Sequence, residues 1–125
     1  MLKQNQIDNI IKEQKVVFTT VSGSGQPRSI WVMPSRVLED KIILSNIQME
    51  KSIQNIKQNN KCFINVYMAD KDDLQYKIEG EADIYESGTL FEEIKKYEET
   101  ENLPPELKVN SIIVVNIKSF EESNG

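Results

Sequence analysis

The chain has 125 residues, of which 38% are hydrophobic and 28% charged, a composition typical of one ordinary globular domain spanning residues 1–125. The formal net charge of −5 argues against nucleic-acid binding, because domains that bind nucleic acids are normally basic. The sequence contains no histidine, which excludes serine–histidine and cysteine–histidine nucleophilic pairs and most zinc and haem sites.

The single cysteine, Cys62, cannot form an internal disulfide, which favours a reducing environment. Its apolar neighbours Phe63 and Ile64 indicate a buried structural thiol. No run of residues approaches the roughly 20 apolar residues that a membrane-spanning helix needs. We therefore expect a cytoplasmic protein that binds neither nucleic acid nor membrane.

Hydrophobic periodicity predicts three short helices and six strands. Apolar residues three or four positions apart indicate helices over residues 7–13, over about 49–58 and over 87–97, with Ser87 as a possible cap. β-branched runs or alternating patterns indicate strands at residues 16–21, 28–38, 41–45, 61–68, 76–85 and 109–117. The polar tail from Ser119 is expected to fray. This order predicts mainly β structure, in the form of a small and mostly antiparallel β-barrel.

Three strands carry further signals. Pro34 interrupts the second strand, which should bend or lie at a sheet edge there. Trp31, just before that break, is either a core aromatic or a wall against a planar ligand. In strand 76–85 the small residues Gly80 and Ala82 share the inner face, which suits a strand that coils sharply in a closing barrel. The last strand is apolar at consecutive positions, so we expect it to be buried on both faces.

The segment after the third strand contains the clearest candidate site. Met49, Ile53 and Ile56 share one face of the second helix and are expected to anchor it to the core. Lys51 and Ser52 lie in its first turn, where free helix amides and a lysine together favour a phosphate. The alternative is that Lys51 is an ordinary solvated lysine.

These features resemble the FMN-binding split β-barrel family, which includes pyridoxamine 5'-phosphate oxidase and its shorter relatives. The resemblance lies in the order of the elements and in Gln26-Pro27-Arg28, Met49-Glu50-Lys51-Ser52 with Asn55-Ile56, Ile78-Glu79-Gly80-Glu81-Ala82 and Leu90-Phe91-Glu92-Glu93-Ile94. The resemblance covers nearly the whole chain, and it is strongest with the small FMN-binding proteins of about this length. It implies a six-stranded antiparallel split β-barrel with Greek-key topology.

In this family FMN lies at a homodimer interface, so the resemblance implies the same arrangement here. Lys51 and Ser52 would hold the phosphate. The flavin ring and ribityl chain would run along the second and third strands, at Trp31, Val32, Met33, Ser45, Asn46 and Ile47. Small relatives can place an aromatic residue of the partner subunit near the flavin, but residues 107–110 contain none. Tyr97 or another residue would then cover the ring, or the flavin would be more exposed.

The resemblance implies an FMN-binding flavoprotein, a small redox protein or an oxidoreductase with an unidentified electron donor or acceptor. The chain lacks the C-terminal portion of pyridoxamine 5'-phosphate oxidase, so we do not expect that specific activity. No residue is assigned as a catalytic acid or base. Two alternatives stay open. One is a non-catalytic barrel that binds flavin or a partner. The other is a different cofactor, either a deazaflavin or a haem ligated by a tyrosine, Met49 or Cys62.

Overall fold

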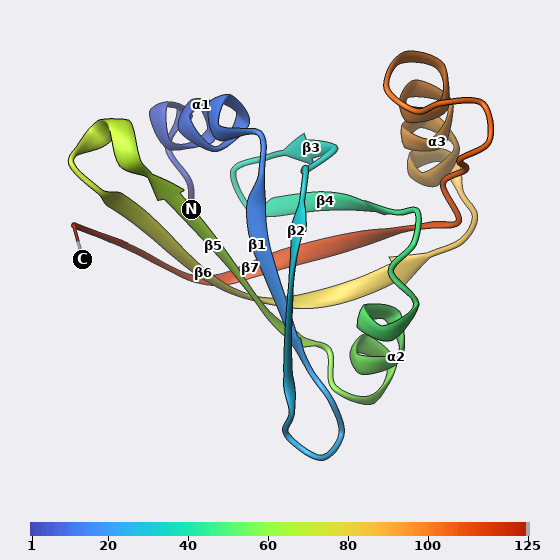
Figure 1. The fold of residues 1–125 in the computed structure, drawn as a ribbon, viewed down its shortest axis with the longest axis horizontal. Helices are drawn as coiled ribbons and strands as arrows, with labels where there is room; N and C mark the ends of the chain where they lie inside the picture. The colour runs from blue at the N-terminus through green and yellow to red at the C-terminus, as the bar shows by residue number, and fades with distance from the viewer. Residues whose placement is uncertain (125) are drawn as a thin grey trace.

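The structure is a computed structural model that describes residues 1–124 (Figure 1). Within these residues it contains three α-helices, one 3-10 helix and seven strands. Their bounds are α1 Gln4–Glu13, β1 Val16–Val21, β2 Pro27–Val32, β3 Arg36–Val37, β4 Lys41–Asn46, α2 Glu50–Gln58, β5 Lys61–Met68, η1 Ala69–Lys71, β6 Leu74–Tyr85, α3 Thr89–Glu101 and β7 Ser111–Ser123. No helix among residues 1–124 is long and apolar enough to cross a membrane.

All seven strands form one antiparallel sheet with the order β2-β1-β5-β6-β7-β4-β3. The two edge strands, β2 and β3, are consecutive in the chain and are separated only by residues 33–35. Pro34 lies in this link and divides the predicted second strand in two, which is why the structure has seven strands rather than six. No ladder of hydrogen bonds pairs β2 with β3 among the described residues, so only this covalent link joins the two edges of the sheet. This is expected of a split barrel.

The sheet coils strongly, so that β1 and β2 cross the direction of β4, β6 and β7 in Figure 1. Strands β5, β6 and β7 are neighbours in sequence and in space, and β4 lies beside β7, which is a Greek-key arrangement. The predicted fold class, mainly β with short helices in an antiparallel split barrel, is confirmed.

The main core fills the inside of the curled sheet. It contains inward side chains of all seven strands together with Ile10 of α1 and Ile56 of α2, against which Met49 and Ile53 pack. These three residues of the segment around α2 are thus the core anchors predicted from their spacing. The inner face of β6 alternates as expected, with Tyr76, Ile78, Gly80 and Ala82 buried.

A second, smaller core lies on the outer face of β4 and β7, beneath α3. Phe91 and Ile94 of α3 pack there against Ile43, Ile112 and Val114. Because Ile113 and Val115 face the main core, β7 is buried on both faces, as predicted.

Several predicted boundaries are wrong. Helix α1 begins at Gln4 rather than at residue 7, and α3 ends at Glu101 rather than at residue 97. The N-cap of α3 is Gly88 rather than Ser87, and no side chain caps the helix. The tail does not fray at Ser119, because β7 continues to Ser123 and pairs with the first half of β6. There the Phe120 ring lies edge-on to the buried Tyr76 ring, with 5.2 Å between the centroids. This aromatic contact compensates for the polarity of the surrounding tail.

Candidate functional site

A groove of about 740 Å³ lies beside the break between β2 and β3. It is lined by α1, by the β2–β3 segment, by the end of β4 with the turn that follows it, and by α3. Elements far apart in sequence therefore contribute to one concave surface. In the view of Figure 1, α1 and α3 lie on either side of β3.

Five of the residues predicted for a cofactor line this groove, namely Trp31, Val32, Met33, Ser45 and Ile47. The Trp31 side chain is 69% exposed and that of Met33 is 58% exposed. Trp31 is therefore not a core aromatic, which removes one of its two interpretations. Strand alternation explains the difference, because Val32 between them is buried in the main core while its neighbours point outward.

Asn46 does not line the groove but fixes the turn that does. Its side-chain oxygen accepts a hydrogen bond from the Met49 amide at 2.9 Å, and its side-chain nitrogen donates to Ser111 Oγ at 2.9 Å. Asn46 thus ties the end of β4 both to the entry of α2 and to the start of β7.

Lys51 and Ser52 also lie outside the groove lining, although Met49, two residues before Lys51, is part of it. Lys51 is exposed in the first turn of α2. Ser52 is 1% exposed, and its hydroxyl has no hydrogen-bond partner within the described chain. In this arrangement Ser52 Oγ faces protein, so contact with a phosphate requires another rotamer. Their role in phosphate binding stays a prediction.

Asn55, further along α2, is structural. Its side-chain nitrogen donates to Thr20 Oγ1 at 3.0 Å, and Thr20 is fully buried in β1. This bond satisfies a hydroxyl that would otherwise be buried without a partner.

Sequence reasoning missed a chain of polar side chains in the groove. Ser35 Oγ lies 2.6 Å from Ser45 Oγ and donates to Glu98 Oε2 at 2.7 Å, and Asn102 donates to the other carboxylate oxygen. All four residues line the groove. Glu98 follows Phe91 by seven residues and therefore shares its helix face. A charged residue on that otherwise apolar face was the available signal.

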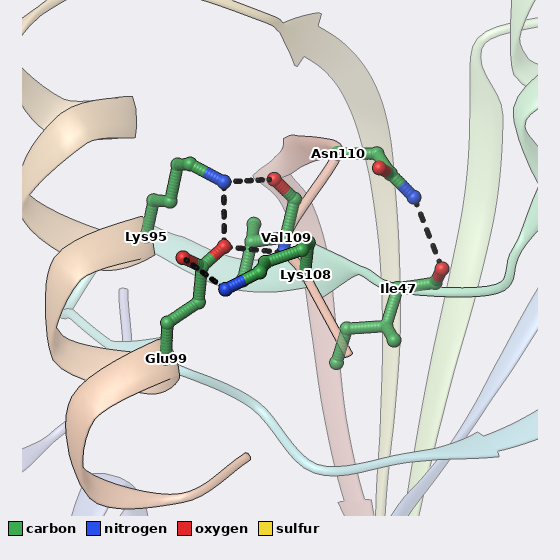
Figure 2. Close-up of polar contacts among 6 residues, drawn as sticks. All are labelled: Ile47, Lys95, Glu99, Lys108, Val109 and Asn110. Carbon is green, nitrogen blue, oxygen red and sulfur yellow. Dashed lines mark hydrogen bonds and ion pairs between the residues drawn. The ribbon is translucent and has the colours of Figure 1, made fainter. Parts of the chain in front are cut away.

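A second polar cluster fixes the turn after β4 to the segment before β7 and to α3 (Figure 2). Asn110 donates through its side chain to the Ile47 carbonyl at 3.1 Å and through its backbone amide to the Asn46 carbonyl at 2.8 Å. Glu99 of α3 accepts from the Val109 amide at 2.8 Å and from Lys95, which also donates to the Val109 carbonyl. The segment before β7 is thus fixed between α3 and the predicted cofactor strand.

Glu99 is expected to stabilise the fold at neutral pH more than in acid. The hydrogen bond from Lys95, and next the one from the Val109 amide, hold the pKa of Glu99 below its ordinary value. Its contribution is therefore complete above the unfolded-state pKa and is lost as the pH falls through the lower folded-state pKa. Glu99→Gln should lower the urea midpoint at neutral pH, and the difference from wild type should shrink in acid.

Glu101→Gln provides the matched control, because Glu101 is exposed on the same helix and forms no ion pair with the described residues. Its urea midpoint should follow that of the wild type at every pH. A Glu99→Gln midpoint that also follows wild type throughout would contradict a stabilising role for this cluster.

Cys62 is a buried thiol, as predicted. Burial, followed by the nearby charge of Glu81, raises its pKa to about 12. The Cys62 side chain is enclosed in the main core with 0% exposure, which makes it unsuited to be the ligand of a haem.

Comparison with known proteins agrees with this geometry at the level of the fold. A crystal structure of HupZ from Group A Streptococcus is 21% identical, with a TM-score of 0.86, covering 100% of this chain and 96% of that one. An FMN-binding protein from Syntrophomonas wolfei subsp. wolfei is 17% identical, with a TM-score of 0.80 and coverage of 94% and 84%. An F420 reductase is 18% identical, with a TM-score of 0.73 and coverage of 96% and 98%.

At the level of sequence, none of the curated proteins matches the chain. The family model described as pyridoxamine 5'-phosphate oxidase does match it, over residues 4–124. Because that match spans nearly the whole chain, the protein belongs to the pyridoxamine 5'-phosphate oxidase family.

Proposed function

We propose that this protein binds FMN in the groove and acts as a small redox protein of the pyridoxamine 5'-phosphate oxidase-like class. The observation that carries the proposal is the groove itself. Its volume of about 740 Å³ lies within the range of roughly 300–1,000 Å³ usual for cofactor sites, and five residues predicted from sequence line it. The family match and the FMN-binding structural neighbour support the same class of ligand.

The side chains in the groove fit a flat ring with one polar edge. Trp31, Met33, Ile47 and Tyr97 supply apolar and aromatic surface, while Ser45 and its hydrogen-bonded partners supply polar atoms. Aromatic and apolar walls with a few placed polar groups are the usual lining of such sites. The ring would lie along the β2–β3 segment and the end of β4.

The start of α2 suits the phosphate. The first amides of an α-helix have no acceptor within the helix, and the macrodipole favours an anion there. The same dipole makes a lysine in the first turn unfavourable, and Lys51 forms no ion pair with the described residues. A bound phosphate would remove this disadvantage, which supports a functional rather than a structural role for Lys51.

We also propose that two copies pair over the groove. Four large apolar side chains of its rim, Ile11, Trp31, Met33 and Tyr97, are 57%, 69%, 58% and 54% exposed. Large exposed apolar side chains gathered around one groove are typical of an interaction surface. A second copy packed there would cover these side chains and enclose the ring between subunits.

In this proposal FMN supplies one- or two-electron transfer, and the protein binds the cofactor and limits its exposure to water. The titratable side chains that line the groove are Arg36, Tyr97 and Glu98, and we assign none of them a proton-transfer role. The electron donor and acceptor would approach the open side of the groove.

Sedimentation of the purified protein, recorded at both a protein and a flavin absorption wavelength, tests the two proposals together. We expect both signals to move as one species with twice the mass of the chain. The mass of the released chromophore would distinguish FMN from a deazaflavin. A colourless protein that takes up no added FMN would overturn the flavin proposal. A monomer that carries bound flavin would overturn the pairing.

A further inference from the structure

The polar chain in the groove has a fixed direction of hydrogen bonding. A carboxylate oxygen can only accept, so Ser35 must use its single proton for Glu98 Oε2, 2.7 Å away. The bond of 2.6 Å between Ser35 and Ser45 then needs the proton of Ser45. Ser45 Oγ is left with lone pairs only, and Ser45 is one of the residues that line the groove.

The far end of the chain keeps this direction in place. The second carboxylate oxygen of Glu98 accepts from Asn102, so the carboxylate is oriented from both sides. No lysine or arginine of the described residues forms an ion pair with Glu98, and Arg36, which also lines the groove, is paired with Glu93. This end of the groove therefore offers hydrogen-bond acceptors and uncompensated negative charge, and it favours a ligand that donates.

We propose that Ser45 accepts the imide N–H of the flavin ring and thereby sets the orientation of the ring in the groove. This inference rests on the proposed function. An oxidised isoalloxazine ring has one N–H, at N3, and its other polar ring atoms only accept. Ser45 Oγ, which can only accept a hydrogen bond, is therefore complementary to that N–H and to no other polar atom of the ring. Ser35, Glu98 and Asn102 act as positioning residues, because they hold the Ser45 proton away from the ligand.

The test compares the binding of FMN with that of N3-methyl-FMN, which lacks the donor. Dissociation constants are measured by calorimetry at neutral pH for the wild type and for Ser45→Ala and Ser35→Ala. The wild type should bind FMN roughly ten-fold more tightly than the methyl derivative, the usual effect of one hydrogen bond. Ser45→Ala removes the acceptor and should bring this ratio close to one. Ser35→Ala frees the Ser45 proton, but the Ser45 oxygen keeps its lone pairs, so the ratio should fall below the wild-type value without reaching one.

Glu101→Gln is the matched control, because it removes the same type of charge from α3 at an exposed residue that lies outside the groove lining and forms no ion pair with the described residues. It should keep the wild-type ratio. If the wild type binds both compounds equally, or if the ratio persists in Ser45→Ala because the methyl group merely clashes, the inference is wrong although the flavin function stands. If FMN does not bind at all, the proposed function fails and this inference fails with it.

Discussion

Replacing Gly80 with alanine is expected to lower the free energy of unfolding by about 3 kcal/mol, the upper part of the usual range for overpacking a core. A Cβ at this position would lie 2.6 Å from Val115 Cγ1 and 2.8 Å from the carbonyl oxygen of Asn116. The Val115 side chain could shift, but the carbonyl belongs to the backbone of β7, which pairs with β6 on both sides of the bulge between Glu79 and Gly80. The melting temperature should fall by roughly 10 °C.

Gly25→Ala separates this clash from the general cost of replacing a glycine. Gly25 lies in the β1–β2 turn with φ of +90°, and a Cβ there would meet no atom within 4 Å. That substitution should cost only the backbone strain of the left-handed region, about 1–2 kcal/mol. A Gly80→Ala protein as stable as the wild type would contradict the close approach of β6 and β7 on which the barrel curvature depends.

Gly80 also illustrates how far local patterns lead. Period-two alternation placed it on the inner face of β6, and its small size indicated a sharply coiled strand; both features are present in the structure. Pro34 was equally informative. A proline has no amide hydrogen to donate to a ladder, so it predicts a break in the strand whatever the tertiary structure around it. Such signals depend on one residue and its neighbours, so they can be read from the sequence.

The groove depends on the meeting of distant segments, and no local pattern reports that. Glu98 looked like part of a connection because Pro104 and Pro105 follow it, yet α3 continues through it to Glu101. Its partner Ser35 lies 63 residues earlier, in the link that Pro34 creates. Propensity could place each residue within its own segment, but only the packing of α3 on β4 and β7 brings them together.

The start of α2 lies between these two cases. The spacing of Met49, Ile53 and Ile56 correctly predicted which face of the helix is buried. It did not reveal that Ser52 lies on the buried side with an unpartnered hydroxyl, because the rotamer of a serine depends on tertiary packing. Lys51 is exposed on the helix and remains the residue of this turn on which the phosphate prediction depends.

Lys51→Ala is expected to weaken FMN binding by roughly ten- to a hundred-fold, since a charge-assisted contact contributes about 1.5–3 kcal/mol. The substitution should not destabilise the fold. Removing a cation from the first turn of a helix relieves an unfavourable interaction with the macrodipole, so the stability of the apoprotein should stay the same or rise by up to about 1 kcal/mol. Loss of binding with unchanged stability would separate a ligand contact from a structural effect.

Riboflavin, which has the ring and ribityl chain but no phosphate, makes the experiment specific. The wild type and Lys51→Ala should bind riboflavin with the same affinity, so that the whole difference between them lies in the phosphate. Lys57→Ala is the matched control, because Lys57 is exposed in the last turn of the same helix, far from the free amides. It should leave the binding of both compounds unchanged. If Lys51→Ala instead binds FMN as the wild type does, the phosphate lies elsewhere; if it weakens riboflavin equally, Lys51 acts on the ring and the orientation proposed for the flavin must be reversed.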